Sequence, residues 1–464
     1  MSQCKYVEPM SDCPFSQASM NSEDTLPTNR ASSLLTALQL SNQQIWLQAL
    51  GRSLCQISAG LIYFYIPLVF VNQVGLSATS VGFSVGLSSL SGIVGHILGG
   101  VLADSPRFGR KTTLVLSGIL GALESFLLAF THTLPLLMAA CLLLGLSVGF
   151  YWTAADAAVM DVTRTTERSQ AFAIMNVAEN IGNGVGILGG GILLTLVHQS
   201  HQWLFIACGV IYLAFAMMVH LTMPSPHQQH LEELHTSAGL FVALKDKSLL
   251  IFILANLLFT TYIALVTSTI PLYFTNFVPA ISGGADAAVT STASLFTWCY
   301  IGAGAVLQIP IAQLLNRFAK VHVLMFALVF WAMGFALVWL TGTATVAQFA
   351  LGVTALFIMA LASVAYKPFA AAIVAELAPS SLRGAYIAIS SQCWTIGYFI
   401  GPTLGGWAMD QSITLAHRSW LVAAATTFLG VIVLTAFDRV HGSIIPPTPG
   451  IEKSVPSTQA SVIN

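Results

Sequence analysis

Twelve long apolar runs constrain the fold of this chain more than any other feature. A bilayer core needs about 20 consecutive apolar residues per helix, and these runs lack the period-two alternation of barrel strands. Only 8% of the residues are charged and 56% are hydrophobic, whereas a soluble domain has roughly 25% charged residues. We therefore predict an all-α membrane protein whose transmembrane helices lie near 46–71, 79–103, 112–131, 134–160, 169–197, 202–223, 248–275, 288–315, 322–341, 346–375, 384–409 and 418–437.

The basic residues predict the orientation, because Lys and Arg favour the cytoplasmic side of a membrane. With both termini inside, most of the 17 Lys and Arg residues face the cytoplasm, and only Arg418 falls in an outer loop. The protein is expected in the plasma or inner membrane. The longest break between runs separates six spans from six. The predicted segments are a disordered tail (1–44), an N-terminal bundle (45–223), a cytoplasmic linker (224–247), a C-terminal bundle (248–440) and a second disordered tail (441–464).

The two sets of six spans repeat each other. IPLVFVN at 66–72 returns as IPLYFTN at 270–276. Because six is an even number, the two copies have the same orientation and are related by an axis along the membrane normal. We predict two pseudo-symmetric six-helix bundles. Further matches in the same order pair Arg107 with Arg317, Arg110 with Lys320, Asp161 with Glu376, Arg168 with Arg383, Gly182 with Gly397, Gly186 with Gly401 and Gly190 with Gly405.

Three glycine-containing motifs are distinctive: GGVLADSPRFGRK (99–111), GNGVGILGGG (182–191) and GYFIGPTLGG (397–406). The first resembles the loop between helices 2 and 3 of the major facilitator superfamily, and the third resembles the antiporter motif of that family, in particular of its twelve-helix drug:proton antiporter branch. GNGVGILGGG (182–191) is the helix 5 counterpart, with Ile187 in place of the proline. Helix 4 reads AACLLLGLSVG (139–149) and lacks the arginine usual in the branch.

The resemblance implies a gate at the cytoplasmic mouth. Asp104, Arg107 and Arg110 would pair with an acid at the inner end of helix 4 and with the start of helix 11, and so close this side. Asp156 or Asp161 could be that acid. The alternative is that these charges only set the topology.

The second half has Asn316 where the first has Asp104, so the gate is expected to be asymmetric. Two pairs share one spacing, Asp161 with Arg168 and Glu376 with Arg383. They are expected to close locally across the inner turns between helices.

Charged residues within the spans are costly, at about 2.5–3.5 kcal/mol each on insertion scales. Glu179 is the main candidate for coupling or substrate binding. Asn176, Glu179 and Asn183 share one helix face, which Asn180 borders. The alternative is a buried acid paired with a base. The remaining charges are Arg52 and Lys367, either of which could snorkel, Asp156, and Glu124, for which a structural hydrogen bond is expected.

Aromatic residues flank these charges, among them Trp152 and Trp394. They could line a central cavity for an amphipathic organic molecule or belong to an interfacial belt. The glycines at 182, 186 and 190, like those at 397, 401 and 405, could pack helices closely or form a sliding seam between the halves.

We therefore predict a secondary transporter that works by alternating access and exports a small amphipathic compound in exchange for protons. Uptake or facilitated exchange of a metabolite is one alternative, and a transporter-like sensor or scaffold is another. No nucleophile–base or metal constellation indicates an enzyme, and HQQHLEELH (227–235) does not fit the H-E-x-x-H pattern. The predicted partners are a substrate, protons and the bilayer. We expect a monomer without a cofactor or metal. The net charge of −1 argues against a nucleic-acid partner.

Overall fold

The computed structural model describes residues 43–164, 167–197, 200–223, 243–282, 288–379 and 382–442. These residues form helices and short connections without strands, which confirms the predicted all-α class. The N-terminal half contains α2 (Gln43–Asn72), α3 (Ala78–Asp104), α4 (Gly109–Ala129), α5 (Leu134–Val162), α6 (Arg168–Leu196) and α7 (His201–Thr222). The C-terminal half contains α9 (Lys247–Phe277), α10 (Pro279–Ser282), α11 (Ala288–Phe296), η1 (Thr297–Gly302), α12 (Ala303–Leu315), α13 (Lys320–Thr343), α14 (Gln348–Leu377), α15 (Arg383–Met409) and α16 (Ile413–Gly442).

Eleven membrane-spanning candidates in the described part of the chain are both long and apolar enough to cross a bilayer. The remaining predicted span forms α15, whose 27 residues are sufficient in length. It falls short in apolar content because its middle carries Ser390, Ser391 and Gln392. This helix packs against α3 and α9, so neighbouring helices cover part of its surface.

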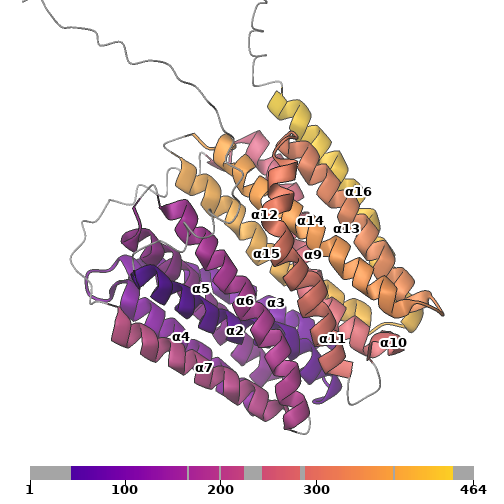
Figure 1. The fold of residues 1–464 in the computed structure, drawn as a ribbon, viewed down its shortest axis with the longest axis horizontal. Helices are drawn as coiled ribbons and strands as arrows, with labels where there is room; N and C mark the ends of the chain where they lie inside the picture. Colours follow the sequence, from indigo (N-terminus) through magenta and orange to yellow (C-terminus); the bar gives the residue numbers. More distant parts are fainter. Residues whose placement is uncertain are drawn as a thin grey trace, which may run out of the picture. The chain divides into compact units, whose positions relative to one another are not determined.

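The two halves use equivalent helix contacts, as the sequence repeat predicts. In the N-terminal half α2 packs on α6, α3 on α5, and α4 on α7. In the C-terminal half α9 packs on α15, α12 on α14, and α13 on α16. Figure 1 shows the first set in indigo to magenta and the second in pinkish red to yellow. Pro67 in α2 and Pro271 in α9 occupy matching positions in this arrangement.

The eighth span departs from its counterpart. Its equivalent in the first half, α3, is continuous, whereas the eighth span consists of α11, the π-helical turn η1, and α12. The wider turn η1 contains Tyr300, whose hydroxyl lies 3.0 Å from the Ser363 hydroxyl of α14. π-Helical turns are frequently found at functional sites, and this one contacts both α6 and α14.

The glycine stripes pack helices within each half, and the expectation of a seam between the halves is wrong for them. A Cβ on Gly186 would lie 2.1 Å from the carbonyl oxygen of Ile57 in α2. In the second half, a Cβ on Gly401 would lie 2.7 Å from Ala264 Cβ in α9. The same two faces carry the other stripe glycines, because residues four apart lie on one side of a helix; these are Gly182 and Gly190 against α2, and Gly397 and Gly405 against α9.

Different glycines lie where the halves meet. A Cβ on Gly82 of α3 would lie 2.0 Å from the carbonyl oxygen of Pro402 in α15, and one on Gly406 would lie 2.1 Å from the carbonyl oxygen of Ala78. Helix α15 therefore packs on α9 with one glycine face and approaches α3 closely with another. Residues 43–44 and 441–442 of the predicted tails are helical, as the ends of α2 and α16. The rest of the tails and most of the linker, with His227, His230 and His235, lie outside the described residues.

Candidate substrate cavity and gates

Arg52 of α2 forms an ion pair with Asp156 of α5. The Arg52 side chain is only 4% exposed, and its guanidinium carbon lies 4.8 Å from the centre of the Trp152 ring. The expectation that Arg52 reaches toward the membrane surface is therefore wrong, because the carboxylate of Asp156 on the neighbouring helix α5 pairs with it. Asp156 serves this pair and is not the acid that contacts Arg110.

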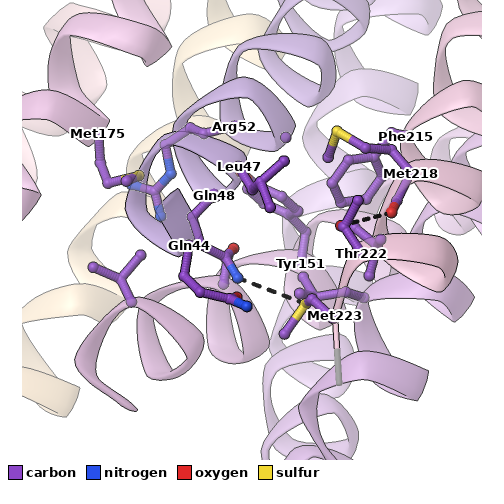
Figure 2. A pocket seen from close by; sticks show the side chains of 15 residues that line it. Gln44, Leu47, Gln48, Arg52, Tyr151, Met175, Phe215, Met218, Thr222 and Met223 are labelled. Carbon is purple, nitrogen blue, oxygen red and sulfur yellow. Dashed lines mark hydrogen bonds between the residues drawn. The ribbon is translucent and has the colours of Figure 1, made fainter. Parts of the chain in front are cut away.

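A pocket in the N-terminal half leads to Arg52. Figure 2 shows Gln44 and Gln48 of α2 on one side and Met218 and Met223 on the other, with Met175 beside Arg52. The Gln48 amide nitrogen lies 3.6 Å from the Met223 sulfur. Methionine side chains adapt to varied contents. Sequence reasoning missed this pocket, because nothing in the spacing of its lining residues distinguishes them from ordinary core residues.

Glu179 of α6 is partly buried and forms no ion pair within the part of the chain that the structure describes. Lys367 and Arg52 lie close enough to act on it electrostatically, as does Asp156. The alternative of a direct pair with either base is therefore not found. On the same face Asn176 is exposed.

The two amides beside Glu179 differ in their surroundings. Asn180 donates its side-chain amide to the Asn176 carbonyl at 2.9 Å, and this bond holds it along its own helix. Asn183 is half-buried, and its carbonyl and side-chain oxygens lie close to the position that a Cβ on Gly60 of α2 would take. Asn176 is therefore the amide of this face most open to a ligand.

The C-terminal half provides an aromatic wall. The Lys367 ammonium of α14 lies 5.9 Å from the centre of the Trp394 ring. Trp394 in turn lies 6.1 Å from the Tyr398 ring, and Tyr398 lies 6.3 Å from Tyr63 of α2. A continuous row of rings thus crosses from one half to the other. Trp298 does not belong to it, since its side chain is 69% exposed.

A polar cluster next to this wall was not anticipated. The Tyr366 hydroxyl donates to the side-chain oxygen of Asn256, and the Asn256 amide donates to the Ser390 hydroxyl at 3.1 Å. The Tyr366 ring lies 6.5 Å from Trp394. The one sequence signal was Asn256 itself, an amide within the apolar run 248–275. A buried hydrogen-bonded network of this kind fixes side-chain orientation.

Equivalent ion pairs occur at the predicted cytoplasmic end of both halves. Arg110 pairs with Asp161, and Lys320 pairs with Glu376. These are the residues that the repeat aligns. The local pairing of Asp161 with Arg168 is not found among the described contacts, since Asp161 turns to α4 instead. Glu376 likewise turns to α13; the side chain of Arg383 lies outside the described part.

The loop residues of the predicted gate are open in this structure. Asp104 and Arg107 are exposed. Asp104 lies close enough to Arg110 to act on it electrostatically, and Arg110 also donates to the Ala157 carbonyl at 2.7 Å. The loop is thus linked to α5, whereas its predicted contact with the start of helix 11 remains a prediction.

The hydrogen bonds that the described residues form between the halves gather at the predicted outer end. Asp410, after α15, accepts bonds from the backbone N–H groups of Ala78 and Thr79 at 2.8 and 2.7 Å. Asn72 and Asn276 exchange two side-chain bonds of 2.9 Å. Sequence reasoning missed these contacts, although both asparagines end the repeated heptapeptide.

Glu124 of α4 takes part in none of the ion pairs of the described residues. It is fully buried, and neither carboxyl oxygen has a hydrogen-bond partner among the described residues. The expected structural hydrogen bond is therefore not found. Its surroundings include Cys141, Cys208 and Tyr212, all within the N-terminal half.

Residues 49–292 and 274–463 match the family model of the Major Facilitator Superfamily. The chain belongs to this superfamily. The Multidrug resistance protein MdtH of Klebsiella pneumoniae subsp. pneumoniae is 28% identical over 389 residues, which cover 81% of this chain and 89% of that protein. MdtH of Proteus mirabilis is 26% identical over 390 residues, with 82% and 90% covered. The predicted resemblance to the drug-exporter branch of the superfamily is confirmed.

Solved structures of the superfamily share the fold at low sequence identity. The nucleoside transporter NupG superposes with a TM-score of 0.72 at 14% identity, covering 85% of this chain and 99% of NupG. The peptide transporter POT, in complex with sulfate, gives a TM-score of 0.69 at 14% identity, covering 87% of this chain and 96% of POT. The superfamily and these relatives point to a secondary transporter in a membrane, not to an enzyme.

Proposed function

We propose that this superfamily member exports a small amphipathic organic compound in exchange for protons, with Glu179 as the coupling residue. The observation that carries the proposal is the position of Glu179. It is partly buried on α6, has opposite charges within electrostatic range, and forms no ion pair in the described part of the chain. A carboxyl group in this position can hold either a proton or the charged group of a substrate.

The surroundings of Glu179 support an amphipathic substrate. Trp152 and Trp394 present aromatic surface from the two halves, and a row of rings runs from Trp394 through Tyr398 to Tyr63 of the N-terminal half. Such walls with few polar groups suit aromatic organic molecules. The names of the relatives in Klebsiella and Proteus agree with export of drug-like compounds.

The distribution of contacts supports alternating access. The hydrogen bonds between the halves gather at the predicted outer end, around Asp410 and around Asn72 with Asn276. At the other end Asp104 and Arg107 are exposed. We infer that this is an inward-open arrangement, with both termini on the cytoplasmic side.

The test uses purified protein in proteoliposomes with an imposed pH gradient. Wild-type protein should accumulate a fluorescent amphipathic compound against its gradient, and Glu179→Gln should lose this gradient-driven transport while keeping its thermal stability. Glu167→Gln, the same change at the start of α6, is the matched control and should transport normally. If a well-folded Glu179→Gln variant transports like the wild type and with the same pH dependence, the proposed coupling role of Glu179 is refuted.

Metabolite uptake remains a second candidate because residues 139–149 lack the arginine usual in the antiporter branch. In the cluster of Asn256, Tyr366 and Ser390, the first two side chains are buried and bonded to each other, so the partly exposed Ser390 hydroxyl is the group available to a polar compound. Reversing the imposed gradient separates the two functions. Exchange requires proton and substrate to move in opposite directions, whereas coupled uptake requires the same direction.

A further inference from the structure

Each half holds a cation against a tryptophan, but only one of these contacts is fixed. Arg52 over Trp152 is buried and bound to Asp156. Lys367 over Trp394 is exposed, and no ion pair joins it to an acid within the described residues. The Lys367 ammonium is thus the mobile member of the two, because a lysine side chain has a flexible four-carbon stem.

The repeat relates the positions of Lys367 and Glu179. The alignment that pairs Arg168 with Arg383 also pairs Trp152 with Lys367, and Glu179 with Trp394. Each half therefore presents one tryptophan and one charged residue at these two positions, in exchanged order. The acid of the first half and the lysine of the second lie within electrostatic range of each other.

The Lys367 ammonium occupies the place that a cationic ligand would take. An organic cation in this cavity would gain most by placing its charge over the Trp394 ring and near the Glu179 carboxylate. Lys367 already makes the first of these contacts and lies within range of the second. A cation–π contact at an exposed site is weak, so an aromatic ligand can displace the lysine from the ring.

We propose that Lys367 is a specificity-determining residue that acts as an internal competitor for cationic aromatic ligands at Trp394. It covers the ring in the empty protein and moves aside when a ligand binds. Its charge disfavours a cation relative to an anion of the same shape. This inference rests on the proposed function, because it assumes that the substrate binds between Glu179 and Trp394.

The test compares two aromatic ions of nearly equal shape, tetraphenylphosphonium and tetraphenylborate, in equilibrium binding to detergent-purified protein. Lys367→Met should tighten tetraphenylphosphonium binding by about tenfold, because a charge that repels this cation is removed. The same change should weaken tetraphenylborate binding, because the anion loses an attractive charge. Lys367→Arg should keep the wild-type preference. Trp394→Leu in the Lys367→Met background should remove most of the gain in affinity, because the ring on which the cation would lie is then absent.

Lys245→Met is the matched control, since Lys245 is exposed on the loop before α9 and the charge change is the same. An unchanged preference between the two ions in Lys367→Met, or an equal change in Lys245→Met, would overturn the inference and leave the proposed function intact. If neither ion binds to the wild type or to Lys367→Met, the aromatic cavity is refuted, and the inference and the proposed function fall together.

Discussion

Asp410 accepts a 2.7 Å hydrogen bond from the backbone N–H of Thr79, and so connects the end of α15 to the first turn of α3. It also accepts from the Thr79 hydroxyl and from the Ala78 N–H. The first N–H groups of a helix have no partner within it and carry a partial positive charge. A single carboxylate thus joins the two halves at the predicted outer end.

Asp410→Asn should weaken this closure. The amide keeps the size of the side chain but loses its charge. This loss should destabilise the state with a closed outer end by about 1–2 kcal/mol. Spin labels at the outer ends of α3 and α15 should report a larger population at long distance. Asp438→Asn, an exposed acid near the end of α16, should leave the distance distribution as in the wild type. Equal distributions in Asp410→Asn and wild type would contradict the assignment.

Gly82→Ala should open the same end by a different route. The added Cβ would lie 2.0 Å from the carbonyl oxygen of Pro402, so α3 and α15 must separate. Such overpacking costs about 1–3 kcal/mol. Gly100→Ala on the same helix meets nothing within 4 Å and serves as the control. The same spin-label distances check the prediction, which fails if the two variants behave alike.

Asp104→Asn should shift the population toward the inward-open state. Asp104 is exposed in this structure, so the substitution should cost little here. Its effect should fall on the state in which the cytoplasmic mouth is closed, because that state loses a charge. Distances across the mouth should lengthen on average, whereas Asp104→Glu should retain most of the wild-type distribution. Unchanged distances, under conditions where the wild type samples both states, would count against a gating role.

Gly186→Ala should lower the thermal stability of the protein. Its Cβ would lie 2.1 Å from the Ile57 carbonyl oxygen, between two helices of one half, at a cost of about 1–3 kcal/mol. Gly189→Ala, less than one turn further along α6, meets nothing within 4 Å. It should be neutral or slightly stabilising, because alanine favours helix by up to about 1 kcal/mol over glycine. Equal melting temperatures in the two variants would refute the close contact of α6 with α2.

The spans could be predicted because each one needs a long apolar run, and the repeat then supplied the pairing of helices. The alignment of Arg110 with Lys320 and of Asp161 with Glu376 contained the two equivalent ion pairs. The family resemblance offers Asp161 as one of two acids for Arg110, and the structure shows this pair. For Glu376 the sequence spacing predicts only its near neighbour Arg383, so its pair with Lys320 is not anticipated. Which face of an α-helix meets which neighbour depends on packing, so the Gly186 stripe could be recognised but not assigned to α2.

The contacts between the halves were harder to foresee. Asp410 lies in a short connection, and nothing near it indicates that its partner is a helix start far away in the sequence. Arg52 and Asp156 were both noted as costly charges, yet their pairing depends on the approach of α2 to α5. For Glu179, helical periodicity predicts the face that it shares with Asn176. The charges that surround this face come from other helices, so only the structure shows them.

The contact between Asn72 and Asn276 has a consequence for the origin of the fold. These residues are copies of each other, and a residue that touches its own copy must lie close to the axis that relates the copies. The two bonds are reciprocal, each amide donating to the other at 2.9 Å. Such self-complementary contacts are typical of two-fold symmetric dimers. The pair therefore marks the position at which two separate and identical six-helix chains would have met before they were joined into one.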